Sequence, residues 1–194
     1  LSLMMDEAQV VRLLVNYFFS IFDATLRARA REMGMSVHEA VTLASIVEGE
    51  ARLDAERPVI AAVYHNRLKR RMRLQADPTV IYGMGADYQG NIRRRHLQQA
   101  TPYNTYVIDG LPPTPIAMPG REALEAAVKP EPGKSLYFVA KGDGSHVFSS
   151  SLSEHNRAVR AYQLQRRSDY RSSPAPEAAP IRAARLVDRP WELE

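Results

Sequence analysis

The sequence has 194 residues, of which 45% are hydrophobic and 25% are charged. This composition is typical of a soluble globular protein and argues against wholesale disorder, a collagen-like repeat and a polytopic membrane protein. The net charge of +4 makes an anionic partner plausible, and the absence of cysteine excludes disulfides, a thiol nucleophile and a Cys-ligated zinc site.

The N-terminal region predicts one long helix. Apolar residues recur at helical intervals from about Asp6 to Met33, and Gly34 ends the pattern. The segment carries Arg12 and has no uninterrupted apolar run long enough to span a bilayer, so it suits an amphipathic helix better than a signal peptide. Because the sequence starts at Leu1 without an initiator Met, we expect it to be a piece of a longer chain.

Two further helices are expected before residue 74. Ser36 and Glu39 have the spacing of a capping box, and the helix that they open runs to about Arg52. A third helix follows Asp54, with Pro58 in its first turn or just before it.

The segment from Leu74 to Gly120 is interrupted by glycine and proline every few residues. A stretch of this length without clear regular structure is uncommon in a compact domain unless it builds a binding surface. We therefore expect it to form long loops that border a cleft.

The C-terminal part predicts a short helix over residues 121–128 and a β-hairpin over residues 135–149. A second capping box, Ser151 with Glu154, opens a last helix that is expected to run to about Arg167.

Together these elements predict an α+β fold, in which several helices pack around a small antiparallel sheet that includes the hairpin. We divide the chain into a helical lead-in (1–35), a main domain (36–167) and an extended or disordered tail (168–194).

Two carboxylates stand out, because the second helix is apolar nearly all round and such a helix is normally buried. Glu48 and Glu50 point about 200° apart on a helix and do not serve one cleft together unless Gly49 breaks it. A carboxyl against apolar neighbours has a raised pKa, as a general acid at neutral pH requires. Pairing with Arg52 or Arg57 would instead give either Glu a structural role. Spacing alone does not decide which of Glu48 and Glu50 is the acid.

Other site classes lack their sequence signals. The five histidines show no close metal-binding pair, no phosphate-binding glycine motif occurs, and no serine lies in a nucleophile elbow. Basic clusters at 67–73 and 93–95 suggest nucleic-acid binding, but no recognised motif accompanies them and solvated helix ends explain them equally well. We expect no metal, no cofactor and no nucleic acid.

Several motifs occur in one order along the chain: A-S-I-V-E-G-E-A (44–51), N-R-L (66–68), M-R-L-Q-A-D-P-T-V-I-Y-G (72–83), Y-N-T-Y (103–106), G-L-P-P (110–113), G-S-H-V-F (144–148) and E-H-N (154–156). In this order and at this spacing they resemble the endolytic murein transglycosylases, the YceG-like family, over about residues 41–162. Thr114 and Met118 depart from the family pattern, which has Gly and Asn there. These departures affect the conformation of the loop and one polar sugar contact.

The resemblance implies a lyase that cleaves the MurNAc–GlcNAc β-1,4 bond of peptidoglycan and leaves a 1,6-anhydro-MurNAc end, terminating strand elongation. The catalytic acid/base of the family is a Glu in the first motif, and we assign it to Glu48, with Glu50 as the alternative. One carboxylate suffices, because the C6 hydroxyl of the substrate is the nucleophile, whereas a hydrolase needs two.

Polar side chains of the same motifs are candidates for binding sugar hydroxyls and for steadying the oxocarbenium-like intermediate. Each has a plain structural alternative, such as a turn or core role. Arg67 and Arg73 are also candidates for meeting the carboxylates of the peptide stems. The candidate substrate-binding residues are Glu50, Arg67, Gln75, Asp77, Tyr82, Asn104, Tyr106, His146 and Asn156.

Two other readings of the same motifs remain open. A hydrolytic muramidase would use Glu48 with a distant carboxylate such as Asp77, and a non-catalytic module would bind glycan without cleaving it. By resemblance, the full-length protein has a single inner-membrane anchor and a periplasmic catalytic domain, and cell-wall synthesis enzymes are expected partners.

Overall fold

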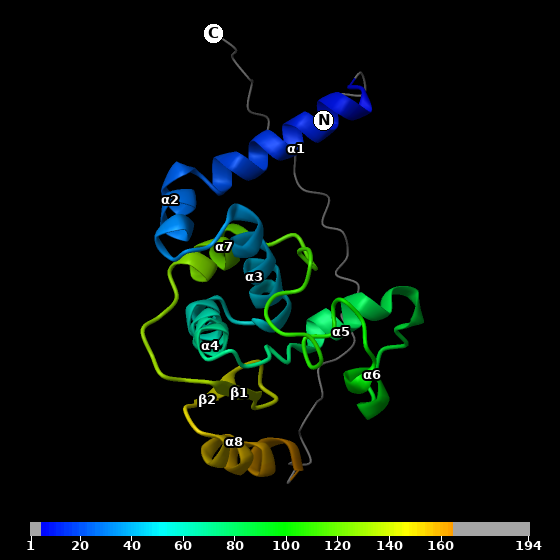
Figure 1. The fold of residues 1–194 in the computed structure, drawn as a ribbon, viewed down its shortest axis with the longest axis vertical. Helices are drawn as coiled ribbons and strands as arrows, with labels where there is room; N and C mark the ends of the chain where they lie inside the picture. The colour runs from blue at the N-terminus through cyan, green and yellow to red at the C-terminus, as the bar shows by residue number, and fades with distance from the viewer. Residues whose placement is uncertain (1–4, 165–194) are drawn as a thin grey trace.

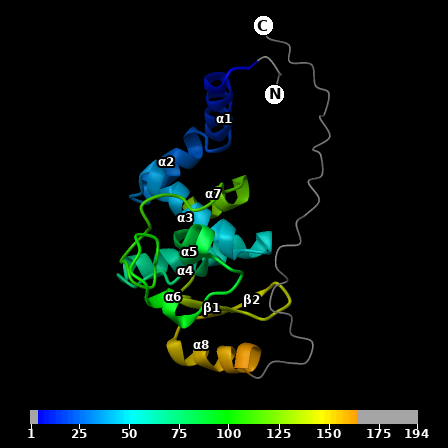
Figure 2. The same cartoon turned by 90° about the vertical axis from the view of Figure 1, so that its right-hand side faces the viewer.

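The structure, a computed structural model, describes residues 5–164 (Figures 1 and 2). Helices surround one two-stranded antiparallel sheet in the part that it describes, which confirms the predicted α+β class. The elements in chain order are α1 (Glu7–Ile21), α2 (Ala24–Glu32), α3 (Val37–Glu50), η1 (Asp54–Glu56), α4 (Arg57–Lys69), α5 (Asp77–Met84), η2 (Gly85–Asp87), α6 (Arg94–Gln98), α7 (Arg121–Val128), β1 (Tyr137–Ala140), β2 (His146–Ser149), α8 (Leu152–Val159) and η3 (Arg160–Leu164), a π-helical turn.

The N-terminal region forms two helices, so the prediction of one helix from Asp6 to Met33 is wrong. The helix is interrupted between α1 and α2. Phe22 is fully buried at this point, and Asp23 accepts a hydrogen bond from the amide of Leu26 at 3.0 Å. A break allows Phe22 to enter the core, and Asp23 satisfies an open helix-end amide. α1 contributes no buried residue and projects from the body in both views (Figures 1 and 2).

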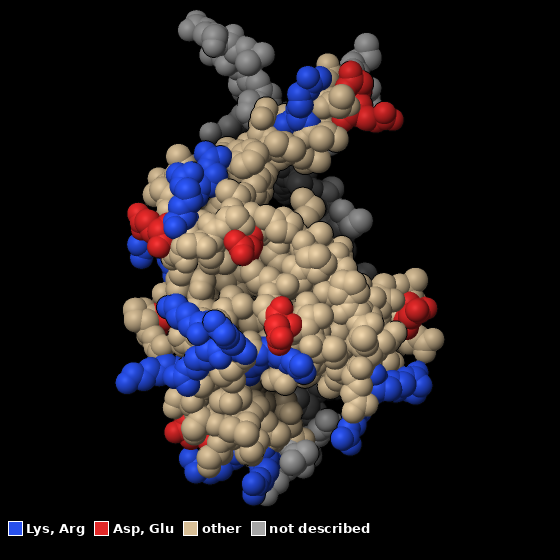
Figure 3. All heavy atoms as spheres, in the orientation of Figure 1, with Lys and Arg blue, Asp and Glu red and all other residues tan. Residues whose placement is uncertain are grey.

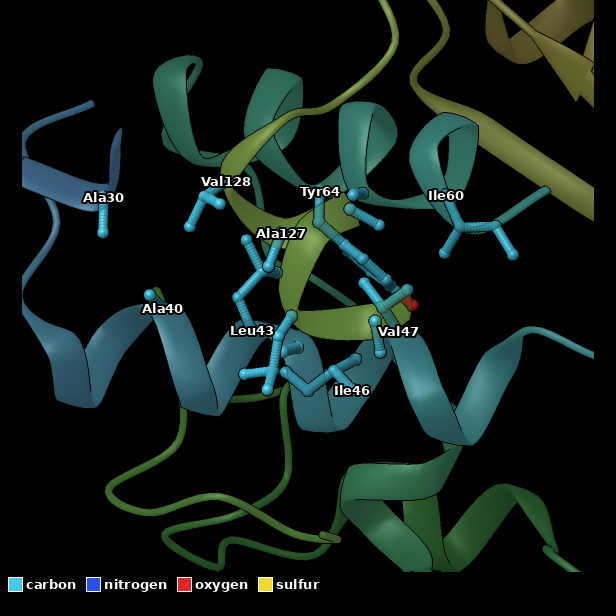
Figure 4. Close-up of a cluster of buried hydrophobic side chains, with 14 of the residues drawn as sticks. Ala30, Ala40, Leu43, Ile46, Val47, Ile60, Tyr64, Ala127 and Val128 are labelled. Atoms are coloured by element: carbon cyan, nitrogen blue, oxygen red, sulfur yellow. The ribbon is translucent and has the colours of Figure 1, made fainter. Parts of the chain in front are cut away.

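The core lies where α3, α4 and α7 meet (Figure 4). Leu43, Ile46 and Val47 of α3 are fully buried there, together with Ile60 of α4 and Val128 of α7. Burying side chains of this size contributes about 1.5–3 kcal/mol each. α3 is therefore held on nearly all sides, and its C-terminal residues have fixed positions.

Both predicted capping boxes are present, at the start of α3 (Ser36 with Glu39) and of α8 (Ser151 with Glu154). Pro58 lies in the first turn of α4. Backbone N–H groups there have no acceptor within the helix, so a proline costs no hydrogen bond.

The predicted hairpin is confirmed. Strands β1 and β2 pair antiparallel, with Tyr137 opposite Ser149 and Ala140 opposite His146. α8 contacts both strands and lies along the sheet in both views (Figures 1 and 2). The sheet is thereby placed between α4 and α8.

The segment from Leu74 to Gly120 is more regular than predicted, because it contains α5, η2 and α6. α5 packs closely on α3: a Cβ added to Gly49 would lie 2.9 Å from Cβ of Pro78. This close approach fixes the start of α5, and with it Asp77, beside the C-terminal end of α3.

The predicted helix end at Arg167 and the tail over 168–194 lie outside the described residues, and the division of the chain at residue 35 stays a prediction. Among residues 5–164, the helices are all too short or too polar to cross a bilayer.

Candidate active site

A cavity of about 410 Å³ opens beside the C-terminal end of α3, between α4, the start of α5, the sheet and α8. Polar and titratable side chains from distant parts of the sequence converge on it, as expected of a substrate site. Its lining residues are Glu50, Tyr64, Arg67, Leu74, Gln75, Asp77, Tyr106, Phe138, Val139, Ala140, His146, His155, Val159 and Gln163.

Glu50 is the carboxylate that α3 presents to this cavity. Its Oε1 accepts a hydrogen bond from the hydroxyl of Tyr64, at 2.9 Å. Burial and, to a smaller extent, the negative charge of Asp77 raise the pKa of Glu50 from its ordinary value to about 7, against the opposite effects of the Tyr64 hydrogen bond and of Arg67. A carboxyl that is partly protonated at neutral pH is suited to both donating and accepting a proton.

Glu48, the residue assigned as the acid from the motif, lies outside the cavity lining. Its Oε1 is 3.2 Å from a terminal guanidinium nitrogen of Arg57, and its Oε2 accepts a hydrogen bond from the amide of Gly120 at 3.1 Å. The side chain is 30% exposed. These contacts tie α3 to α4 and to the start of α7, which is the structural alternative that the sequence left open.

Asp77 and Tyr106 form one wall of the cavity. The Tyr106 hydroxyl donates to Oδ1 of Asp77 at 2.7 Å, and burial together with that carboxylate raises the pKa of Tyr106. Both residues were predicted from sequence as substrate-binding candidates, and the fold brings both to the cavity.

Arg67 lines the cavity but is 7% exposed and is bonded to the surrounding backbone. Its Nε donates to the carbonyl of Leu136 at 2.6 Å, and Nη1 donates to the carbonyl of Leu74 at 2.8 Å. Burial lowers the pKa of Arg67. The guanidinium therefore joins α4 to the hairpin and to the start of the 74–120 segment, and its donors are largely occupied.

Arg73 binds the carbonyl of Tyr106 at 3.0 Å, with Asp109 3.5 Å away.

Gln75 has a left-handed backbone conformation, with φ of +50°. Its amide donates to the carbonyl of Thr105 at 3.1 Å, and its side-chain oxygen lies 3.3 Å from Arg67. A non-glycine residue in this region stores strain, and such strain is concentrated at functional sites.

His146 and His155 also line the cavity. Nδ1 of His146 lies 2.6 Å from Oε2 of Glu56, and His155 stacks on Tyr137 with ring centroids 5.2 Å apart. Burial lowers the pKa of His155.

Three other candidates predicted from sequence are not part of the lining. Asn104 is 1% exposed and donates to the carbonyls of His96, Leu97 and Gln99, so it caps the C-terminal end of α6. Tyr82 packs on Tyr103, with ring centroids 4.8 Å apart, and Asn156 is exposed on α8.

The two departures from the family pattern have different surroundings. The hydroxyl of Thr114 lies 2.8 Å from that of Tyr103, a contact that a glycine would not make. Met118 is 90% exposed.

Sequence reasoning missed Tyr64, Glu56 and His155. His155 carried a signal, since it stands inside the E-H-N motif. Tyr64 and Glu56 carried none, because helical spacing assigns Tyr64 to the core and Glu56 to a helix end.

The basic clusters are largely solvated. Figure 3 shows Lys and Arg side chains gathered over the region where Figure 1 places α4. Lys69, Arg70 and Arg71 are exposed, and none of the three forms an ion pair within residues 5–164. Across the same residues, no three His, Cys, Asp or Glu side chains are grouped so as to hold a metal ion.

Comparison with known proteins identifies relatives. The model of the YceG-like family matches residues 2–161. An endolytic murein transglycosylase of Bacillus subtilis is 43% identical over 138 residues, which are 71% of this chain and 38% of that protein. A protein of the same name from Streptococcus pneumoniae is 29% identical over 161 residues, 79% of this chain and 29% of that protein.

A crystal structure of a putative YceG-like protein from Listeria monocytogenes superposes with a TM-score of 0.71 at 38% identity. The match covers 79% of this chain and 49% of that one. The chain therefore spans less than half the length of each of these relatives. Since the family model covers most of the chain and the fold agrees, the chain belongs to the YceG-like family.

Proposed function

We propose that the protein is an endolytic peptidoglycan lytic transglycosylase and that Glu50, rather than Glu48, is its acid/base. The observation that carries the proposal is the position of Glu50: a half-buried carboxyl with a pKa of about 7, facing a cavity lined by sugar-binding residue types. The relatives' name, endolytic murein transglycosylase, supports the reaction class.

In the proposed reaction, protonated Glu50 donates its proton to the glycosidic oxygen between MurNAc and GlcNAc as the C1–O4 bond breaks. An oxocarbenium-like centre forms at C1 of MurNAc. The Glu50 carboxylate then removes the proton of the C6 hydroxyl, and O6 bonds to C1. The product is the 1,6-anhydro ring, no water is consumed, and the enzyme recovers its proton.

Other residues of the cavity support these steps. The Tyr64 hydroxyl fixes the orientation of the Glu50 carboxyl. Asp77 lies close enough to act on Glu50 electrostatically, and its negative charge favours the positive charge that develops on the sugar. Gln75, Tyr106 and His146 supply hydrogen-bonding groups for sugar hydroxyls and acetamido groups.

The test uses purified glycan strands and mass analysis of the products. The wild-type chain is expected to release fragments with anhydro ends, each one water lighter than a hydrolysis product. Glu50→Gln keeps the shape and removes the proton, so we expect at least about a 10³-fold loss of rate with an unchanged circular dichroism spectrum.

Glu48→Gln is the matched control, since it changes the same chemical group on the same helix. It weakens the contacts to Arg57 and Gly120 and should lower stability while leaving a measurable rate. A dead Glu48 variant beside an active Glu50 variant would reverse the assignment.

A hydrolytic muramidase is the second candidate, because Asp77 gives the cavity a second carboxylate. Hydrolysis with two carboxylates yields reducing ends instead of anhydro ends. The same mass analysis separates the two reactions, and release of reducing ends alone would establish the hydrolase.

Placement of the catalytic domain outside the cytoplasm, a membrane anchor in the full-length protein and cooperation with cell-wall synthesis enzymes remain predictions from the family. Fractionation of cells that produce the full-length protein tests the first two.

A further inference from the structure

Glu56 makes two hydrogen bonds to a single residue far along the chain. Its Oε1 accepts from the backbone amide of His146 at 2.9 Å, and its Oε2 lies 2.6 Å from Nδ1 of the His146 ring. The side chain of Glu56 is 15% exposed and that of His146 is 8% exposed. One carboxylate thus fixes both the backbone and the ring of His146, in surroundings where such bonds are poorly screened.

The carboxylate determines which ring nitrogen carries hydrogen. A carboxylate only accepts hydrogen bonds, so Nδ1 of His146 carries the hydrogen that is shared with Glu56. In the neutral ring, Nε2 is then left with its lone pair and acts as an acceptor.

The second ring nitrogen of His146, Nε2, is accessible from outside the protein. It makes no hydrogen bond to any residue between 5 and 164, and it is not among the buried polar atoms without a partner in that range. The ring lines the cavity and lies perpendicular to the ring of Phe138, with centroids 5.4 Å apart. The remaining exposure of the side chain therefore includes Nε2, opposite the nitrogen that Glu56 holds.

Phe138 and Tyr64 connect His146 to Glu50, the proposed acid. Phe138 packs edge-on against Tyr64, with centroids 6.0 Å apart, and Tyr64 donates to Glu50. His146 and Glu50 thus line one cavity across a shared aromatic wall.

We propose that Glu56 is a positioning residue of the substrate site: it fixes His146 so that Nε2 accepts a hydrogen bond from a hydroxyl or acetamido N–H of the glycan. The role of the glycan rests on the proposed function, whereas the hydrogen-bonded arrangement does not.

Glu56→Gln gives a sharp test. The backbone amide of His146 needs an acceptor, so the Gln oxygen stays on it and the Gln NH₂ group turns to Nδ1. The ring then carries its hydrogen on Nε2, which changes from acceptor to donor. Nitrogen chemical shifts of the His146 ring at neutral pH are expected to report this exchange of tautomers.

The kinetic expectation is a KM for glycan strands about three- to tenfold higher in Glu56→Gln, as for the loss of one hydrogen bond, with a smaller change in kcat. Glu56→Asp, which keeps the carboxylate, should restore part of the loss. Asp54→Asn is the matched control: it removes the same charge from the same short helix, from a residue that is 80% exposed and contacts Arg57 instead of His146. Its KM should equal that of the wild type.

A double-mutant cycle separates positioning from general support of the fold. If Glu56 acts through His146, the Glu56→Gln change has no further effect on KM once His146 is Ala. Additive effects, or an unchanged tautomer in Glu56→Gln, would overturn the proposal.

The two proposals fail in different ways. Absence of cleavage by the wild-type chain refutes the proposed function alone, because glycan binding to Glu50→Gln still reports on His146. If added glycan strands leave the His146 ring signals of Glu50→Gln unchanged, the positioning role is refuted whatever the activity.

Discussion

Two carboxylates on one helix lie in opposite environments. Both are half-buried, but Glu48 is bonded to Arg57 and to the amide of Gly120, whereas Glu50 lines the cavity with Tyr64 as its hydrogen-bond partner. Burial favours the neutral form of a carboxyl and raises the pKa of Glu50 to about 7. This environment supports the proposal that Glu50 is the proton donor.

The neighbours of Glu50 should shift its titration in opposite directions. Removing the hydroxyl in Tyr64→Phe removes a contact that lowers the Glu50 pKa, so the alkaline limb of kcat should move to higher pH. Removing the charge in Asp77→Asn should move it to lower pH. Profiles of kcat against pH, each normalised to its own maximum, measure the shifts. If the alkaline limb moved in the same direction in both variants, the assignment of Glu50 would be contradicted.

Stability should depend on pH through the same group. The pKa of Glu50 rises from 4.5 to about 7 on folding, so the stability gained from its protonated form is fully present below about 4.5 and is lost as pH rises through about 7. Relative to Glu50→Gln, the wild type should lose up to about 3 kcal/mol of unfolding free energy between these limits. Urea unfolding of both proteins across this range measures the difference. A difference that does not vary with pH would exclude a Glu50 whose pKa is raised by folding.

At the scale of elements, the site depends on how closely α3 and α5 approach. Gly49 lies between the two carboxylates, and the helix continues through it to Glu50. The position leaves no room for a side chain, because Pro78 occupies the space that a Cβ would need. Gly49 therefore permits close packing of helices instead of breaking α3.

Gly49→Ala should destabilise the protein, although alanine is the better helix former by about 1 kcal/mol. The added methyl group forces Pro78 outward, at a cost of about 1–3 kcal/mol, and displaces Asp77 from the cavity. We expect lower activity even at temperatures where the variant is folded. Gly34→Ala is the control: at φ of +74° it is strained but meets no atom within 4 Å, so it should lose stability without losing activity. Equal activity of the two variants would show that the α3–α5 contact is unimportant for the site.

At the scale of the whole molecule, Arg67 joins parts of the chain that are far apart in sequence. It binds the carbonyl of Leu74, at the start of the 74–120 segment, and the carbonyl of Leu136, just before β1. The predicted contact with peptide stems stays a prediction, and the observed bonds give Arg67 a structural role.

Arg67→Lys keeps the charge but cannot reach both carbonyls in the same geometry. Buried carbonyls without partners cost about 1–3 kcal/mol each, so we expect about 2–4 kcal/mol of destabilisation in urea unfolding. The KM for strands that lack peptide stems should rise as much as the KM for strands that carry them. A rise in KM that is confined to strands with peptide stems would instead support the predicted contact between Arg67 and the stems.

Much of this protein follows from the sequence alone. Capping boxes are local, so Ser36 and Ser151 marked the starts of α3 and α8, and strand alternation with a Gly-rich turn marked the hairpin. The family followed from motif order. The two-residue spacing of Glu48 and Glu50 also determined that they face different sides.

Only the tertiary structure decided which of the two carboxylates faces the cavity. The partners that distinguish the two carboxylates, Tyr64 for Glu50 and Gly120 for Glu48, lie 14 and 72 positions away in sequence. The break at Phe22 and the position of Glu56 beside His146 likewise depend on contacts between distant segments. Local patterns fix helix ends and turns, but burial, and with it the pKa of a carboxyl, is set by whatever the rest of the chain packs against it.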